Sequence, residues 1–149
     1  MSIRNIRKNE LRELLNLYKH LHRKDEPLPK KSTLFSIWEE ITNNPLLHYF
    51  VLEHNNEIIS SCSLSIIPNL TRGGRPYGLI ENVVTHTDYR RRGFGTSILE
   101  YALEIAWKQN CYKVMLLTGS KEPGIFLFYE KVGFSKGVKT GFIAYPSDF

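Results

Sequence analysis

The feature that most constrains this fold is a strand, a basic turn and a helix in direct succession. Residues 80–85 are rich in apolar and β-branched side chains, which predicts a buried strand. Beyond the turn, Phe94, Ile98, Ala102, Ile105 and Ala106 recur at helical spacing. Residues 111–118 form a further short apolar run, so the order is strand, helix, strand. Such a crossover makes the two strands parallel neighbours or near-neighbours, with the helix on one face of the sheet.

The turn before the helix has the composition of a phosphate-binding site. The first N–H groups of a helix have no intrahelical partner and carry a partial positive charge, so they attract anions. A diphosphate resting on residues 93–96 would be held by main-chain donors, and the glycines let it approach closely. The residues that would surround it are Arg90, Arg91, Arg92, Gly93, Phe94, Gly95 and Thr96. The alternative is that the arginines form only a solvated loop.

Size and composition favour one domain over residues 1–149. The chain has 149 residues, 42% of them hydrophobic, which is enough for a substantial core. Its net charge of +5 is compatible with several anionic partners, but no zinc-ligand array or aromatic RNA-binding motif is present. An anionic cofactor is enough to explain the positive charge. We therefore expect no nucleic acid partner.

Membrane insertion, secretion and a metal site are not expected either. There is no apolar run of about 18 residues and no leader pattern, so a cytoplasmic location is the default expectation. Cys62 and Cys111 lie in or beside apolar runs, which favours two buried thiols over a disulfide or a metal site.

The remaining pattern predicts further strands and helices. We expect a helix at residues 11–21, a helix capped by Ser32 and stopped at 43–45, and a helix at 125–132 that Gly133 ends. Expected strands are residues 2–7, 48–53, 57–67, 134–138 and 141–145, with a hairpin turn at 54–56. The charged loop 23–31 is either a plain connector or a mobile wall of an acceptor site. The basic loop 68–77 is either a flexible hairpin or an anion contact.

Two motifs resemble signatures of the GCN5-related N-acetyltransferases (GNAT family). Arg90-x-x-Gly93-x-Gly95 is similar to the acetyl-coenzyme A (acetyl-CoA) signature, and residues 128–134, Phe-Tyr-x-x-x-Gly-Phe, resemble the second signature. Residues 80–83 and 110–113 are especially similar to glucosamine-6-phosphate N-acetyltransferases, although Asn82 replaces an acidic residue found in many of them. The resemblance implies an α+β fold with a central, mixed but mostly antiparallel sheet flanked by about four helices.

The resemblance also implies roles in acetyl transfer. Glu81 lies in an apolar strand, where burial would make its carboxylate a better proton acceptor for the amine; a salt bridge is the equally open alternative. Tyr129 has the periodicity of a core aromatic, but in the family this tyrosine protonates the thiolate. Main-chain groups of Val83, Val84 and Thr85 would pair with the pantetheine arm and polarise the acetyl carbonyl.

We accordingly expect an acetyl-CoA-dependent enzyme that acetylates a primary amine of a small molecule. The alternatives are a non-catalytic acyl-CoA sensor and an enzyme that acetylates a protein or peptide amine. The sequence leaves the acceptor and a homodimeric state open.

Overall fold

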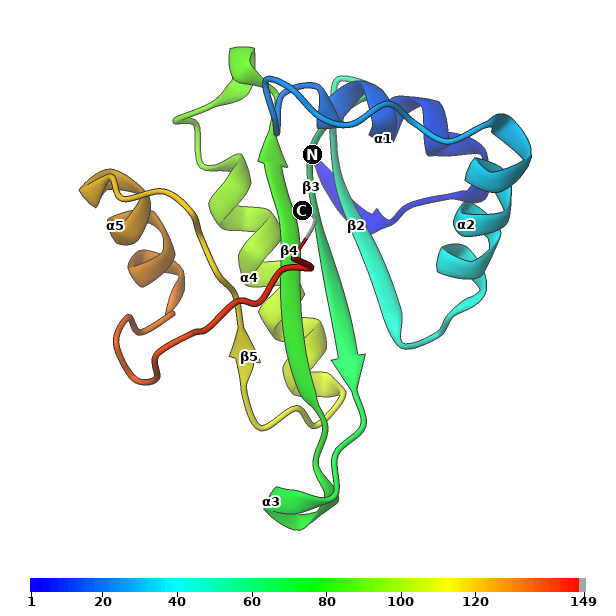
Figure 1. Cartoon of the computed structure of the whole chain (residues 1–149). Helices are drawn as coiled ribbons and strands as arrows, with labels where there is room; N and C mark the ends of the chain where they lie inside the picture. The colour runs from blue at the N-terminus through cyan, green and yellow to red at the C-terminus, as the bar shows by residue number, and fades with distance from the viewer. Residues whose placement is uncertain (148–149) are drawn as a thin grey trace. The chain divides into compact units, whose positions relative to one another are not determined.

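A five-stranded mixed sheet, in the order β1-β2-β3-β4-β5, organises residues 1–116 (Figure 1). It is seen in a computed structural model that describes residues 1–147. By its internal contacts the chain divides into two compact units, Met1–Leu116 and Leu117–Phe149. The strands are β1 (Ser2–Asn5), β2 (Leu47–His54), β3 (Glu57–Ile67), β4 (Tyr77–Thr85) and β5 (Val114–Met115).

The predicted helices of the first unit are present, together with three short helical turns that the sequence did not predict. The predicted helices are α1 (Leu11–Tyr18), α2 (Lys31–Asn43) and α4 (Phe94–Lys108), and the three turns are the short α3 (Thr71–Gly74) and the 3₁₀ turns η1 (Lys8–Glu10) and η2 (Thr87–Tyr89). Within α3, Arg72 and Gly73 have left-handed backbone angles, so it is an irregular turn. The expected α+β fold with a mixed, mostly antiparallel sheet is confirmed.

The sheet is antiparallel from β1 to β4 and parallel only between β4 and β5. The predicted hairpin turn joins β2 and β3, with Asn55 and Asn56 at positive φ, as asparagine tolerates. The crossover through α4 makes β4 and β5 parallel neighbours, as the sequence predicted. However, β5 has two residues instead of the eight expected, because only Gly78 and Leu79 of β4 pair with it.

Helices α2 and α4 cover opposite faces of β2. Trp38 of α2 packs edge-on against Tyr49, whereas Tyr101 of α4 packs edge-on against Phe50. Successive side chains of a strand point to opposite faces, so these two contacts lie on different sides of the sheet. Helix α4 also packs along β3 and β4 through its fully buried apolar face (Figure 1): Ile98, Leu99, Ala102 and Ala106. This packing fixes where α4 begins relative to the end of β4.

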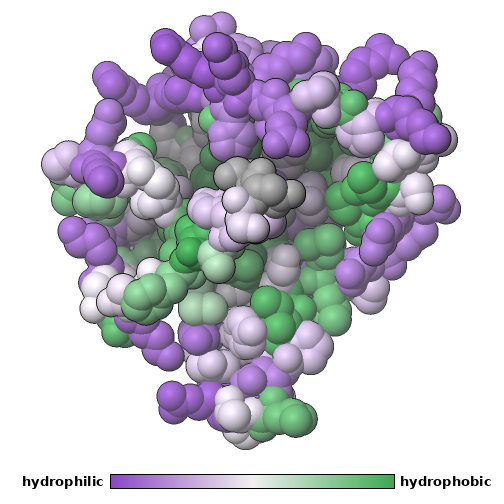
Figure 2. Space-filling view, viewed as in Figure 1, coloured by the Kyte–Doolittle hydropathy of each residue, from purple (hydrophilic) through white to green (hydrophobic). Residues whose placement is uncertain are grey.

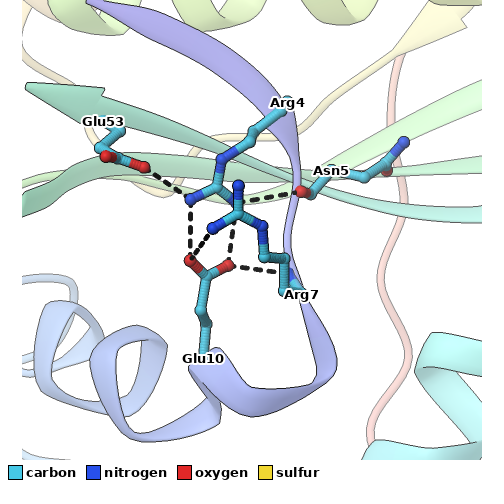
Figure 3. A network of polar contacts seen from close by, with 5 residues as sticks. All are labelled: Arg4, Asn5, Arg7, Glu10 and Glu53. Atoms are coloured by element: carbon cyan, nitrogen blue, oxygen red, sulfur yellow. Dashed lines mark hydrogen bonds and ion pairs between the residues drawn. The ribbon is translucent and has the colours of Figure 1, made fainter. Parts of the chain in front are cut away.

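An ion-pair network ties the N-terminal strand to the sheet (Figure 3). Arg4 of β1 donates to both carboxylate oxygens of Glu10, at 2.7 and 2.9 Å, and to Glu53 of β2 at 2.6 Å. The Arg7 main-chain N–H also donates to Glu10, at 2.8 Å. These contacts hold the pKa of Glu10 below its usual range, chiefly through the hydrogen bond from Arg4. The start of α1 is thereby anchored to β1 and β2.

The second unit contains helix α5 (Pro123–Val132), which Gly133 ends at φ 120°, as predicted. The two strands predicted at 134–138 and 141–145 are wrong, because the described part of the unit has no strand there. Apolar and aromatic residues alone do not make a strand, because the backbone must also find a partner strand for its hydrogen bonds. None of the helices within residues 1–147 has the length and apolar content needed to cross a membrane.

Candidate active site

A one-residue bulge interrupts the pairing of β3 and β4. Ser61 opposes Val84 and Ser63 opposes Glu81, so two residues of β4, Asn82 and Val83, face the single residue Cys62. Asn82 has φ 52°, and asparagine is one of the few non-glycine residues that adopt the left-handed region routinely. Bulges bend a strand and re-aim its groups, and they occur often beside functional sites. The bulge therefore changes the direction of β4 directly after Glu81.

The edge of β4 that faces β5 is open beyond Leu79. The parallel pairing ends at Leu79 and Met115, and no strand among the described residues pairs with residues 80–85 on that side. An open edge offers unpaired N–H and C=O groups to an extended ligand. The predicted pantetheine-binding residues Val83, Val84 and Thr85 all lie on this edge, after the bulge.

Helix α4 starts with an uncapped N-terminus. Gly93 is the N-cap residue with φ 84°, and no side chain in the described part of the chain caps the helix. The first helical N–H with a carbonyl partner is that of Ser97, which donates to Gly93 at 3.0 Å, while the N–H groups of residues 94–96 donate to no described residue. A Cβ atom built on Gly93 would meet no atom of the described residues within 4 Å, so there is space above the turn. These free donors beside open space suit an anion.

Arg90 braces the loop that leads from β4 to α4. Its Nε donates to the Thr85 carbonyl at 3.0 Å, and its Nη2 donates to the His20 carbonyl at 2.7 Å. The His20 ring lies 4.0 Å from the His86 ring, and its Nδ1 accepts a long 3.5 Å hydrogen bond from the Thr87 N–H. Arg90 thus connects the end of β4 with the residues that follow α1.

The other two arginines of the turn are placed differently. The Arg92 guanidinium lies over the rings of Tyr89 and Phe94, 5.3 and 5.5 Å from their centroids. Arg91 is exposed at φ 62° and makes no hydrogen bond or ion pair with any described residue. The surface over this loop, at the top of the view in Figure 2, is largely hydrophilic. Of the three arginines, Arg91 has the side chain that is free to contact a ligand.

Glu81 is exposed, which corrects the expectation of burial. Its neighbour Ile80 is 1% exposed, and consecutive side chains of a strand point to opposite faces, so the apolar strand buries Ile80 while Glu81 faces away. The alternative salt bridge is not found in residues 1–147 either. Glu81 thus stands directly before the bulge with its carboxylate open to solvent.

Tyr129 lies on α5 in the second unit. Its ring is 4.9 Å from that of Phe128 and packs edge-on against Phe134 at 6.2 Å. The Tyr129 carbonyl accepts the Phe134 N–H at 3.2 Å, which closes the C-terminal turn of the helix. Tyr129 thus packs against two aromatic rings but is only half-buried, as no residue of α5 is buried, and its predicted catalytic role stays a prediction.

Comparison with known proteins decides the family. A sequence profile described as acetyltransferase (GNAT) family matches residues 9–134. The chain belongs to the GNAT family. The solved structure of an Agrobacterium tumefaciens protein, an acetyltransferase by assignment only, is 40% identical with a TM-score of 0.91, and the match covers 98% of this chain and 100% of that one.

Two further proteins resemble the chain, one in sequence over part of its length and one in fold. The glucosamine 6-phosphate N-acetyltransferase of Trypanosoma brucei is 41% identical over 85 residues, which are 57% of this chain and 56% of that protein. The chain thus matches only about half the length of this relative. An aminoglycoside N-acetyltransferase solved in complex with CoA is 18% identical with a TM-score of 0.75, and the match covers 97% and 99% of the two chains. At that identity the likeness concerns the fold alone.

Both cysteines and the two irregular loops lie outside the α4 turn. Cys62 and Cys111 are free and buried, as predicted, and burial raises the pKa of Cys62 to about 12. In the basic loop, Arg75 donates to the carbonyls of Asn110 and Cys111, so it braces the protein chain. Residues 21–30 form an irregular, largely exposed connection, which leaves both interpretations of that loop open.

Three features around the bulge were not predicted from the sequence. Asn82 at positive φ was not anticipated, although asparagine between apolar residues of a strand is a signal for a bulge. The three buried serines of β3 were not predicted either, although a polar residue in a predicted core strand needs a hydrogen-bond partner. The third feature is Tyr18, whose buried hydroxyl has no hydrogen-bond partner within residues 1–147; burial raises the pKa of this phenol, and the nearby Asn82 side chain opposes that rise.

Proposed function

We propose that the protein is an acetyl-CoA-dependent N-acetyltransferase that acetylates a primary amine of a small molecule. The observation that carries the proposal is the succession of a bulged, open strand edge and an uncapped helix N-terminus at Gly93. The first suits an extended amide-containing chain, and the second suits a diphosphate; acetyl-CoA contains both. GNAT membership and a structural relative solved with CoA support the same ligand.

In the proposed complex, the N–H groups of residues 94–96 and the guanidinium of Arg91 hold the diphosphate. Arg90 and Arg92 keep the shape of the turn, since both are engaged with protein groups. The main chain of residues 83–85 pairs with the pantetheine arm, and one of its N–H groups polarises the acetyl carbonyl. The neutral thioester is thereby held next to the bulge.

The chemistry then needs two proton transfers. The neutral amine attacks the thioester carbonyl carbon, a C–N bond forms, and the C–S bond breaks with its electron pair leaving on sulfur. We assign Glu81 to accept the proton of the amine through water, because its exposed carboxylate stands beside the bulge. Tyr129 is assigned to protonate the thiolate, a role that its phenol can fill chemically.

The test measures acetyl-CoA binding by calorimetry and thiol release over a panel of amines. Glucosamine 6-phosphate is the first acceptor, in view of the Trypanosoma brucei relative, followed by spermidine, lysine, kanamycin and a short peptide. Binding with turnover of at least one small amine is the expected result. Binding without turnover favours the acyl-CoA sensor, turnover of the peptide alone favours the peptide enzyme, and absence of binding overturns the proposal.

A further inference from the structure

Three serines of β3 are buried in the middle of the sheet. Ser60 and Ser61 are 0% exposed and Ser63 is 5% exposed. Each hydroxyl donates to a main-chain carbonyl of a neighbouring strand, so none is left unsatisfied. The three serines lie on the same strand and are similarly buried, but they donate to different neighbouring strands.

Two of the serines contact β4 at the two sides of its bulge. Ser63 Oγ donates to the Glu81 carbonyl at 3.1 Å, directly before the bulge. Ser60 Oγ donates to the Val84 carbonyl at 2.9 Å, directly after it, and lies 2.9 Å from Thr85 Oγ1. The third serine, Ser61, donates away from the bulge, to the Phe50 carbonyl of β2 at 2.8 Å. Side-chain donors thus bracket Asn82 and Val83, the two residues without a ladder partner.

A bulge without such donors is free to relax. Its extra residue stands outside the ladder, so the peptide planes on either side are held by fewer main-chain contacts than in a regular strand. A hydroxyl that donates to a fixed carbonyl restrains the rotation of that peptide plane. Because the N–H and C=O of a peptide are coplanar, restraining the carbonyls of residues 81 and 84 also sets the directions of the N–H groups of residues 82 and 85.

We propose that Ser60 and Ser63 are positioning residues for acetyl-CoA. They fix the bulged segment of β4, so that the groups of residues 82–85 on its open edge are already aimed at the acetyl and pantetheine part of the ligand. Neither serine contacts the ligand; each acts through the main chain of β4. The inference rests on the proposed function, since it assigns these residues to the same site.

The size of the expected effect on acetyl-CoA affinity follows from how strongly binding depends on aligned groups. A displacement of about 1 Å at a reacting group can lower a rate by about 10²-fold, and misaligned donors also weaken binding. Loss of both hydroxyls should therefore weaken acetyl-CoA affinity by about tenfold or more, the loss expected from roughly one hydrogen bond. A Ser→Ala change removes one oxygen and adds no volume, so steric overlap plays no part.

The experiment compares Ser60→Ala, Ser63→Ala and the double variant with Ser61→Ala as the matched control. Melting temperature, calorimetric affinity for acetyl-CoA and amide hydrogen exchange at residues 82–85 are measured for each. All single variants should lose similar, modest stability. The double variant should bind acetyl-CoA about tenfold more weakly and exchange faster at residues 82–85, whereas Ser61→Ala should stay within twofold of wild type in both.

The outcomes separate this inference from the proposed function. If wild type binds acetyl-CoA and the Ser60 and Ser63 variants bind as Ser61→Ala does, the positioning role is overturned and the proposed function stands. If wild type does not bind acetyl-CoA, the proposed function fails. The rates of amide exchange at residues 82–85 then decide whether Ser60 and Ser63 fix the bulge. Equal exchange in all variants then overturns their role in fixing the bulge. Should the double variant not fold, the two single variants carry the same comparison.

Discussion

Replacing Gly93 by alanine should separate the phosphate-binding turn from the stability of the fold. Gly93 has φ 84°, where an L-residue is disfavoured, so the change should cost about 1–2 kcal/mol of folding free energy. The melting temperature should then fall by a few degrees. The added methyl group meets no atom of residues 1–147 within 4 Å, so no further steric cost within this part of the chain is expected.

The effect on acetyl-CoA affinity should be larger than the effect on stability. The methyl group would occupy space that the proposed diphosphate needs to reach the N–H groups of residues 94–96. A hydrogen bond to a charged group contributes about 1.5–3 kcal/mol, so losing one or two of them should raise Kd at least tenfold. Affinity of the wild type should also fall with salt concentration, because the contacts are partly electrostatic.

Gly74→Ala is the matched control for this experiment. Gly74 has φ 74° and also meets nothing within 4 Å of a built Cβ, but it lies in α3, at the opposite end of β4. Both variants should therefore lose similar stability, and only Gly93→Ala should lose affinity. Isothermal calorimetry and thermal unfolding measure the two quantities. A folded Gly93→Ala protein with wild-type affinity would refute the assignment of the diphosphate to this turn.

Four further predictions concern single side chains. Glu81→Gln should lower turnover most at the acidic end of the pH profile, where free amine is scarce; wild-type rates from about pH 6 to 9 would exclude its role as a base. Tyr129→Phe should keep the fold and lower kcat by a large part of the roughly 10²–10⁴-fold that acid catalysis contributes, and a rate within about twofold of wild type would contradict this. Tyr18→Phe should not lower, and should even raise, the free energy of unfolding measured in urea, because an unsatisfied buried hydroxyl costs about 1–3 kcal/mol. Because the pKa of folded Glu10 lies below its usual value of 4.5, its ionised carboxylate stabilises the fold above pH 4.5, and this stability is lost as the pH falls through the folded pKa. Glu10→Gln should therefore make the free energy of unfolding depend less on pH in this acidic range. If that pH dependence is unchanged in the variant, Glu10 is not its source.

Local patterns in the sequence determined most of the helices and strands. The helical spacing from Phe94 to Ala106, the hairpin asparagines at 55 and 56, and the glycine at 133 each act within a few residues. The order strand, helix, strand then required a parallel pair, because a right-handed crossover has few other solutions. The basic turn at the helix start followed from the same local information.

Partner-dependent properties could not be predicted in this way. The segments expected as strands at 134–138 and 141–145 contain apolar and aromatic residues, but a strand forms only where another strand accepts its hydrogen bonds. The prediction that Glu81 is buried was wrong for a related reason, because its apolar neighbours in the sequence point to the other face of the sheet.

The register of β4 against β3 was decided by the tertiary structure alone. The bulge at Asn82 exists because Ser61 and Ser63 oppose Val84 and Glu81, a relation between residues about twenty positions apart. The same register brings the hydroxyls of the β3 serines onto the carbonyls of β4. Sequence periodicity repeats every two residues along one strand and carries no information on how two strands are offset, so the shape of this site appears only once they pair.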